Sequence, residues 1–271
     1  MGVDTLLALA DAIGRHALLL FLTLLATLLL LVFAAWAGHL QVLPRARPGL
    51  PRPALLLLYA LAGFGIVVAA AAIFAEIAEQ LDPAGAMARA DEALAASIGV
   101  HAAPATLHVF ALLTHLGDPA WLTLLGAGVA LWLWWRRQRA LALGWVLALG
   151  GNALLNPALK RIFERIRPVH EHGLFSEMGF SFPSGHTSGA TVAYGMMAYV
   201  ALRTLPAAWH LPAVLGATAL AFTVGCSRVF LRVHYLSDVL AGFASGGAWL
   251  VVCVMSVEAS RHWRGARTLK K

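Results

Sequence analysis

The stretch from Ala17 to Trp36 contains no charged residue. At about 20 residues it is long enough to cross a bilayer as a helix. A backbone inside lipid must satisfy its own hydrogen bonds, so a run of this kind restricts the fold to helices or a closed barrel. Since 60% of the 271 residues are hydrophobic and only 12% are charged, the rest of the chain has the same character. We therefore expect an all-α, polytopic membrane helix bundle.

Further apolar segments follow, separated by charged or proline-rich breaks, and they predict about seven transmembrane helices, or six if one is miscounted. The predicted spans are 17–36, 54–74, 120–135, 140–157, 187–202, 211–225 and 239–257. Ala35-Trp36-Ala37 has the small-x-small pattern of a signal-peptidase site. A retained span is favoured, because the apolar core is long and two aspartates precede it.

Two segments outside these spans have helical character. Residues 1–16 are mildly amphipathic, which predicts a helix in the plane of the membrane interface. The charges between 76 and 118 predict one or two short surface helices. Gly117-Asp118-Pro119 breaks this pattern and starts the third span. The resulting division is 1–53, an interfacial segment with an extra transmembrane helix; 54–118, the second span with interfacial helices; 119–257, a helix bundle; and 258–271, a basic cytoplasmic tail.

Basic residues indicate the orientation. The groups at 45–52, 136–139 and 203 and the C-terminal tail fall on one side of a seven-span chain, and an excess of arginine and lysine marks the cytoplasmic side. The loops around 160–186 and 227–238 then share the opposite, periplasmic side of a bacterial inner membrane. The formal charge of +7 accompanies no nucleic-acid-binding motif. Cys226 and Cys253 lie in apolar segments and suit packing rather than a disulfide framework or a metal site.

The stretch from Ser227 to Asp238 is polar although it lies between two apolar spans. Ionisable residues beside membrane spans are costly and often functional. His234 and Asp238 are four apart and would share one face of a helix. An aspartate there can fix the imidazole tautomer and leave the other ring nitrogen free to attack, which makes His234 a candidate nucleophile. A buried ion pair at the mouth of the bundle explains the same pair equally well.

Two other motifs are predicted on the same side of the membrane. Lys160 is followed after six residues by Arg167-Pro168, and Pro183-Ser184-Gly185-His186 precedes the fifth span. Together with Arg228, they place a basic cluster on the side where the positive-inside rule expects few cations. Such a cluster suits an anion receptor.

The three motifs, in this order, resemble those of the type 2 phosphatidic acid phosphatase (PAP2) superfamily of membrane lipid phosphatases. The resemblance extends over about residues 117–257 and implies a catalytic bundle in the predicted third unit. It implies that His234 attacks phosphorus, that Asp238 orients it, and that His186 protonates the leaving oxygen and later activates water. It also implies a phosphate site made by Lys160, Arg167, Ser184, Gly185 and Arg228, with no metal or cofactor.

Each of these residue types suits its implied task. Arginine offers a bidentate fork and lysine a point charge for phosphate oxygens. A glycine lets a backbone N–H approach an oxygen, and a helix that begins at Ser184-Gly185-His186 would add its N-terminal amides. The expected substrates are lipid mono- or pyrophosphates such as undecaprenyl pyrophosphate, phosphatidylglycerol phosphate, phosphatidic acid or lipid A phosphates. Apart from the lipid and the bilayer, the sequence specifies no partner.

Alternatives to hydrolysis stay open. The same site could pass the phosphoryl group to a lipid acceptor, or the charges could form a proton or anion path in a transporter, although they cluster at span ends. Three arginines belong to no motif and suit lipid headgroups or neutralisation by Glu164: Arg161, Arg165 and Arg232. His170, Glu171 and His172 are a weak candidate for a metal site, because only two imidazoles lie close together.

Overall fold

The computed structural model describes residues 3–46, 52–168 and 179–268, and within these ranges the chain is helical with no strand. The helices are α1 (Val3–Arg15), α2 (Ala17–Ala46), α3 (Arg52–Glu79), α4 (Ala86–His101), α5 (Pro104–Leu113), α6 (Pro119–Trp135), α7 (Arg139–Phe163), α8 (Gly185–Thr204), α9 (His210–Phe230) and α10 (Leu236–Thr268), with short 3-10 turns η1 (Thr114–Gly117) and η2 (Ala207–Trp209). The expectation of an all-α membrane helix bundle is confirmed.

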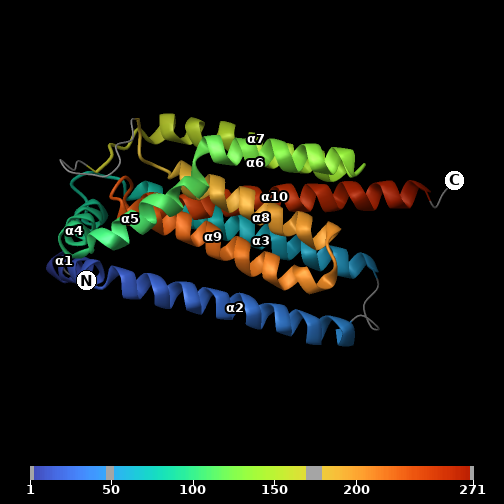
Figure 1. Cartoon of the computed structure of the whole chain (residues 1–271), viewed down its shortest axis with the longest axis horizontal. Coiled ribbons are helices and arrows are strands. Elements are labelled where there is room, and N and C mark those ends of the chain that lie inside the picture. Colours follow the sequence, from blue (N-terminus) through green and yellow to red (C-terminus); the bar gives the residue numbers. More distant parts are fainter. Residues whose placement is uncertain (1–2, 47–51, 169–178, 269–271) are drawn as a thin grey trace.

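The long helices α2, α3 and α6 to α10 run side by side along the molecule (Figure 1). Within the described ranges, five of them are long and apolar enough to cross a membrane: α2, α3, α7, the η2–α9 segment and α10. Helix α6 is apolar but shorter, and α8 carries many small and polar residues. The number of seven spans therefore stays a prediction, whereas the chain is plainly a multi-pass membrane protein.

Helices α1, α4 and α5 lie at one end of this bundle (Figure 1). The Ser97 hydroxyl of α4 hydrogen-bonds the Asp11 backbone carbonyl and carboxylate of α1, at 2.9 and 2.8 Å. Phe110 of α5 stacks on Phe230 at the end of α9, with ring centroids 4.1 Å apart. These contacts confirm short helices between 76 and 118. They also show that α1 packs on α4.

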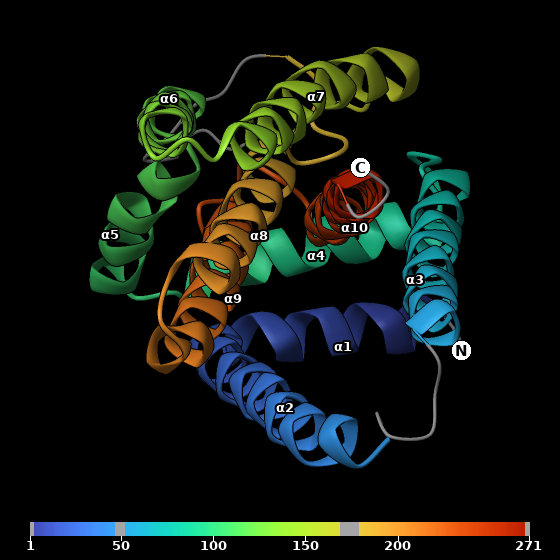
Figure 2. The ribbon, with the colours of Figure 1, turned by 90° about the vertical axis from the view of Figure 1, so that its right-hand side faces the viewer.

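Helix α8 lies among its neighbours α6, α7, α9 and α10 when the bundle is viewed end-on (Figure 2). Its residues Val192, Ala193 and Met196 are fully buried, and they pack against side chains of the flanking helices such as Trp145 of α7 and Val224 of α9. Small residues let the helices approach closely, as is usual between membrane helices.

The helix ends place the three motifs together. Helix α7 ends, α8 begins, α9 ends and α10 begins at the end of the bundle where α1, α4 and α5 lie (Figure 1). The turns between α6 and α7 and between α8 and α9 lie at the other end, and the predicted cytoplasmic arginines lie in or beside them: Arg136, Arg137, Arg139 and Arg203.

Candidate active site

His234 lies in the short connection between α9 and α10, and Asp238 lies in the first turn of α10. The Nδ1 atom of His234 is 3.3 Å from the Asp238 carboxylate, and the two side chains are 1% and 0% exposed. The predicted contact is present, but the prediction that both residues share a helix is wrong. Asp238 accepts the backbone N–H of Tyr235 at 3.0 Å, which holds the chain at the start of the helix as a capping side chain does.

The second nitrogen of His234 faces a cation. Its Nε2 atom is 3.1 Å from Nη1 of Arg167, which also donates to the carbonyl of Val233 at 2.8 Å. Since the guanidinium can only donate, Nε2 accepts this hydrogen bond, and the proton of the ring lies on Nδ1 toward Asp238. This is the tautomer that a histidine nucleophile at Nε2 requires.

Burial lowers the pKa of His234 to about 4, against the opposing influence of the Asp238 carboxylate. The ring is therefore neutral near neutral pH. A neutral imidazole keeps the lone pair needed for attack.

Ser184 caps α8. Its Oγ accepts the hydroxyl of Thr187 at 3.0 Å and the backbone N–H of Thr187 at 3.5 Å, and both contacts leave the Ser184 hydroxyl proton to donate elsewhere. Gly185 is required by packing, because a Cβ at this position would come within 2.9 Å of Oδ1 of Asn156. The first amides of α8 lie at a helix N-terminus, where backbone N–H groups commonly bind anions.

Lys160 lies near the end of α7, and Arg228 lies near the end of α9. Nζ of Lys160 donates to the carbonyl of Phe180 at 2.6 Å. Arg228 is 1% exposed and donates to the hydroxyl of Thr114 at 2.6 Å, while its own carbonyl accepts the backbone N–H groups of Val233 and His234. Arg228 therefore supports the turn that carries His234.

His186 has a carboxylate partner that sequence reasoning missed. Its Nε2 is 2.8 Å from Oδ1 of Asp118, and the other oxygen of Asp118 is 2.6 Å from His115. Burial raises the pKa of Asp118, but hydrogen bonds with His115 and His186 outweigh this and leave it below its usual value. The sequence showed Asp118 only as part of a helix break at Gly117-Asp118-Pro119, far from His186 along the chain.

Arg165 also proves to be part of the site. Its guanidinium donates to Asp238 at 2.7 Å, to the hydroxyl of Ser237 at 2.7 Å and to Asp91 of α4 at 2.9 Å, and it lies over the ring of Tyr235. Burial lowers the pKa of Arg165, but the charges of Asp238 and Asp91 outweigh it and raise the pKa above its usual value.

Arg165 is therefore neither a lipid-headgroup contact nor paired with Glu164, and this prediction is corrected: neutralisation comes from distant carboxylates, because residues 164–168 fold back toward α10. Arg161 is exposed. The backbone of Arg232 has φ 55°, and its guanidinium lies beside Gly99 of α4. The segment from His170 to His172 lies outside the described residues. Within the part of the chain that the structure describes, no three His, Cys, Asp or Glu side chains gather as a metal site would require.

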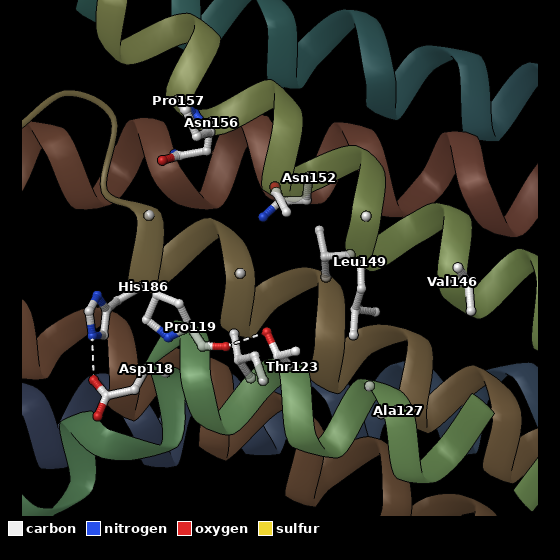
Figure 3. A pocket seen from close by; sticks show the side chains of 18 of the residues that line it. Asp118, Pro119, Thr123, Ala127, Val146, Leu149, Asn152, Asn156, Pro157 and His186 are labelled. Carbon is white, nitrogen blue, oxygen red and sulfur yellow. Dashed lines mark hydrogen bonds and ion pairs between the residues drawn. The ribbon is translucent and has the colours of Figure 1, made fainter. Parts of the chain in front are cut away.

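A cavity of about 920 Å³ connects these polar residues with the space between α6, α7 and α8 (Figure 3). Its polar end is lined by Asp118, Lys160, Gly185, His186 and His234. Further along it is lined by apolar residues, among them Leu122, Ala127, Val146 and Leu149. The cavity thus joins a polar end, lined by Lys160, Asp118 and two histidines, to an apolar channel.

Residues 139–262 match the family model of the PAP2 superfamily. Over 167 residues the chain is 36% identical to phosphatidylglycerophosphatase B of Bacillus subtilis (strain 168), covering 59% of this chain and 80% of that protein. The chain belongs to the PAP2 superfamily. A second relative, the lipid A 1-phosphatase of Rhizobium johnstonii, is 34% identical over 178 residues, which cover 57% of this chain and 69% of that protein.

The fold supports the same membership. The crystal structure of a transmembrane PAP2-type phosphatidylglycerolphosphate phosphatase from Bacillus subtilis superposes with a TM-score of 0.62 at 32% sequence identity, covering 69% of this chain and 93% of that one. The PAP2 family match includes all three motifs but begins at residue 139, so it includes neither Asp91 of α4 nor Asp118, which precedes α6.

Proposed function

We propose that this PAP2 protein hydrolyses mono- or pyrophosphate esters of membrane lipids through a phosphohistidine on Nε2 of His234. The arrangement of His234 carries the proposal: a carboxylate on Nδ1, a cation at Nε2 and a cavity in front of the ring. Membership of the superfamily makes the chain a lipid phosphate hydrolase. The geometry of the site supports the chemical steps that we propose below.

The phosphate site consists of Lys160, Arg167 and Arg228 together with the Ser184 hydroxyl and the first amides of α8. Charge accumulates on the phosphoryl oxygens as they are attacked, and preformed cations and N–H groups stabilise it. Arg167 contacts Nε2 of His234 in this structure. When a phosphate binds, one of its oxygens would accept the hydrogen bond from Arg167 in place of Nε2. The lone pair of Nε2 would then be free to attack phosphorus.

The proton transfers are assigned to His186. As the bond from phosphorus to the lipid oxygen breaks, His186 donates its proton to that oxygen while Nε2 of His234 bonds to phosphorus. His186 then removes a proton from water, which attacks phosphorus, breaks the P–N bond and restores neutral His234. With Nε2 of His186 held by Asp118, Nδ1 is the nitrogen that exchanges the proton. Figure 3 shows this nitrogen on the side of the ring away from Asp118.

The amphipathic cavity supports a lipid substrate, because it can hold a phosphate at its polar end beside Lys160 and part of a hydrocarbon chain between α6 and α7. The relatives are named for phosphatidylglycerophosphate and lipid A phosphate, and we include undecaprenyl pyrophosphate and phosphatidic acid in the class. We place the site on the periplasmic face of a bacterial inner membrane, since the basic turns lie at the opposite end of the bundle (Figure 1).

Phosphate release by the purified protein tests the proposal. Intact protein and His234→Ala are compared in detergent with EDTA on a panel of lipid phosphates and pyrophosphates. We expect metal-independent release that the variant loses by a factor of at least ~10⁴, as for other covalent catalytic residues. A variant with unchanged activity would refute His234 as the nucleophile. Transfer of phosphate to an added lipid, with no free phosphate, would indicate a phosphotransferase.

A further inference from the structure

The face of α7 toward α8 carries two asparagines four residues apart, and both are 7% exposed. Asn156 uses its amide within the protein: Nδ2 donates to Ser188 Oγ at 3.2 Å and approaches the Pro183 carbonyl at 3.4 Å. Asn152 differs. Within the described residues, its amide makes no hydrogen bond, although the side chain is more than nine-tenths buried.

Asn152 borders the cavity (Figure 3). Its neighbour across the helix interface is Gly189, where an added Cβ would lie 3.9 Å from Nδ2. Because Asn152 lines the cavity, a bound molecule can reach its unused amide, and polar groups facing the interior of a membrane bundle often mark a substrate path. The side chain can both donate to and accept from a bound molecule.

The depth of Asn152 specifies which part of a substrate it can meet. Gly185, at the phosphate cradle, and Gly189, beside Asn152, are separated by one turn of α8, a rise of about 6 Å. On α7, Asn156 lies against Gly185. Asn152 is one helical turn further from the polar end of the cavity. Asn152 therefore lies about one helical turn toward the tail channel from the phosphate.

Lipid phosphates differ at that depth. In a glycerolipid, ester or hydroxyl oxygens lie about five bonds from phosphorus, roughly 6 Å along an extended chain. In a polyprenyl phosphate or diphosphate, the corresponding atoms belong to hydrocarbon, which offers an amide no hydrogen bond.

We propose that Asn152 binds the glycerol or ester oxygens of the substrate and so favours glycerolipid phosphates over polyprenyl phosphates. This rests on the proposed function and assigns Asn152 a task that none of the three motifs includes. Loss of the amide removes a hydrogen bond from one substrate class and nothing from the other.

Steady-state kinetics of phosphate release by the full chain in detergent test this assignment. Phosphatidic acid and farnesyl diphosphate serve as substrates for the intact protein, Asn152→Leu, Asn152→Ser and the control Thr218→Val, in which a hydroxyl bonded to the Val214 carbonyl of its own helix is removed. We expect Asn152→Leu to lower kcat/KM for phosphatidic acid about tenfold, as the loss of one hydrogen bond does. The value for farnesyl diphosphate stays within about twofold, Asn152→Ser recovers part of the loss, and Thr218→Val changes neither.

Equal losses on both lipids, or none on phosphatidic acid, would overturn the role of Asn152, and activity on farnesyl diphosphate shows that the variant is folded. If the intact protein released phosphate from neither lipid, the proposed function itself would fail, and this inference with it.

Discussion

His234 has different neighbours on its two ring nitrogens, and this difference makes its protonation testable. Because burial lowers its pKa to about 4, the neutral form persists as the pH falls and is lost only as the pH passes through that value. We expect kcat/KM to have no acidic limb from His234 above about pH 5, since kcat/KM reports the free enzyme.

The pH profile of kcat/KM between pH 4 and 8 checks this expectation. A phosphate ester loses its second proton near pH ~6, so the profile is repeated with an ester of different acidity to identify that contribution. An acidic limb near pH 6 that stays in place when the substrate changes would contradict the lowered pKa of His234.

Asp118 holds Nε2 of His186, and its removal should affect proton transfer more than binding. We expect Asp118→Asn to lower kcat about 10- to 100-fold with little change in KM, a part of the 10²- to 10⁴-fold that general acid–base catalysis contributes. The decrease in kcat should be smaller for an aryl phosphate, because its leaving oxygen needs little protonation.

Comparison of kcat on an aryl phosphate and a lipid phosphate measures this effect. His115→Ala serves as the control, because His115 contacts the other oxygen of Asp118 from an exposed position. A loss that is equal for both leaving groups would indicate a structural role for Asp118.

At the scale of the helices, an ion-pair chain from Asp91 through Arg165 to Asp238 connects α4 to the residue that we propose orients His234. Arg165 is 9% exposed and Asp238 fully buried. Removing one member of a buried pair costs about 3–5 kcal/mol, because the other charge stays behind without compensation. We expect Arg165→Ala to lower both the thermal stability and kcat.

Asp91→Asn should have a smaller effect of the same kind, about tenfold on kcat, because Arg165 keeps Asp238. Glu92→Gln is the matched control, since Glu92 is the exposed neighbour on the same helix. Thermal unfolding in detergent and steady-state kinetics measure the two effects separately. If Asp91→Asn had the same kcat and thermal stability as Glu92→Gln, the contact between Asp91 and Arg165 would contribute nothing to the site.

The helices themselves could be predicted because apolar runs and their breaks are local features. Gly117-Asp118-Pro119 correctly indicated the start of α6 at Pro119, and the span predicted from Thr187 begins two residues earlier, at Gly185. The partners Asp91 and Asp118 could not be predicted, because they approach the motifs only through packing of distant helices. His234 and Asp238 were predicted as neighbours, yet α10 begins after His234, since periodicity does not fix a helix terminus to the residue.

For the whole molecule, the site and the basic turns lie at opposite ends (Figure 1). If the basic turns are cytoplasmic, single cysteines at the two ends will differ in accessibility. We expect Ala84→Cys, in the exposed turn before α4, to react with an impermeant maleimide in spheroplasts, and Ala207→Cys, between α8 and α9, to react only after lysis.

Both single-cysteine proteins also carry Cys226→Ala and Cys253→Ala, which remove the two native thiols, and the double variant without a new cysteine is the control. Labelling at Ala207→Cys before lysis, with none at Ala84→Cys, would reverse the proposed orientation.

Helix α6 borders the tail channel and begins one residue after Asp118. A hydrocarbon chain that shifts this helix would therefore also move the Asp118 carboxylate, which contacts His186. Soluble phosphate esters, which lack a tail, would not move the helix or this carboxylate. The enzyme would then hydrolyse small phosphates slowly, because their kcat would be low as well as their affinity. This is expected when binding energy from a remote part of the substrate is used to lower the barrier of the reaction.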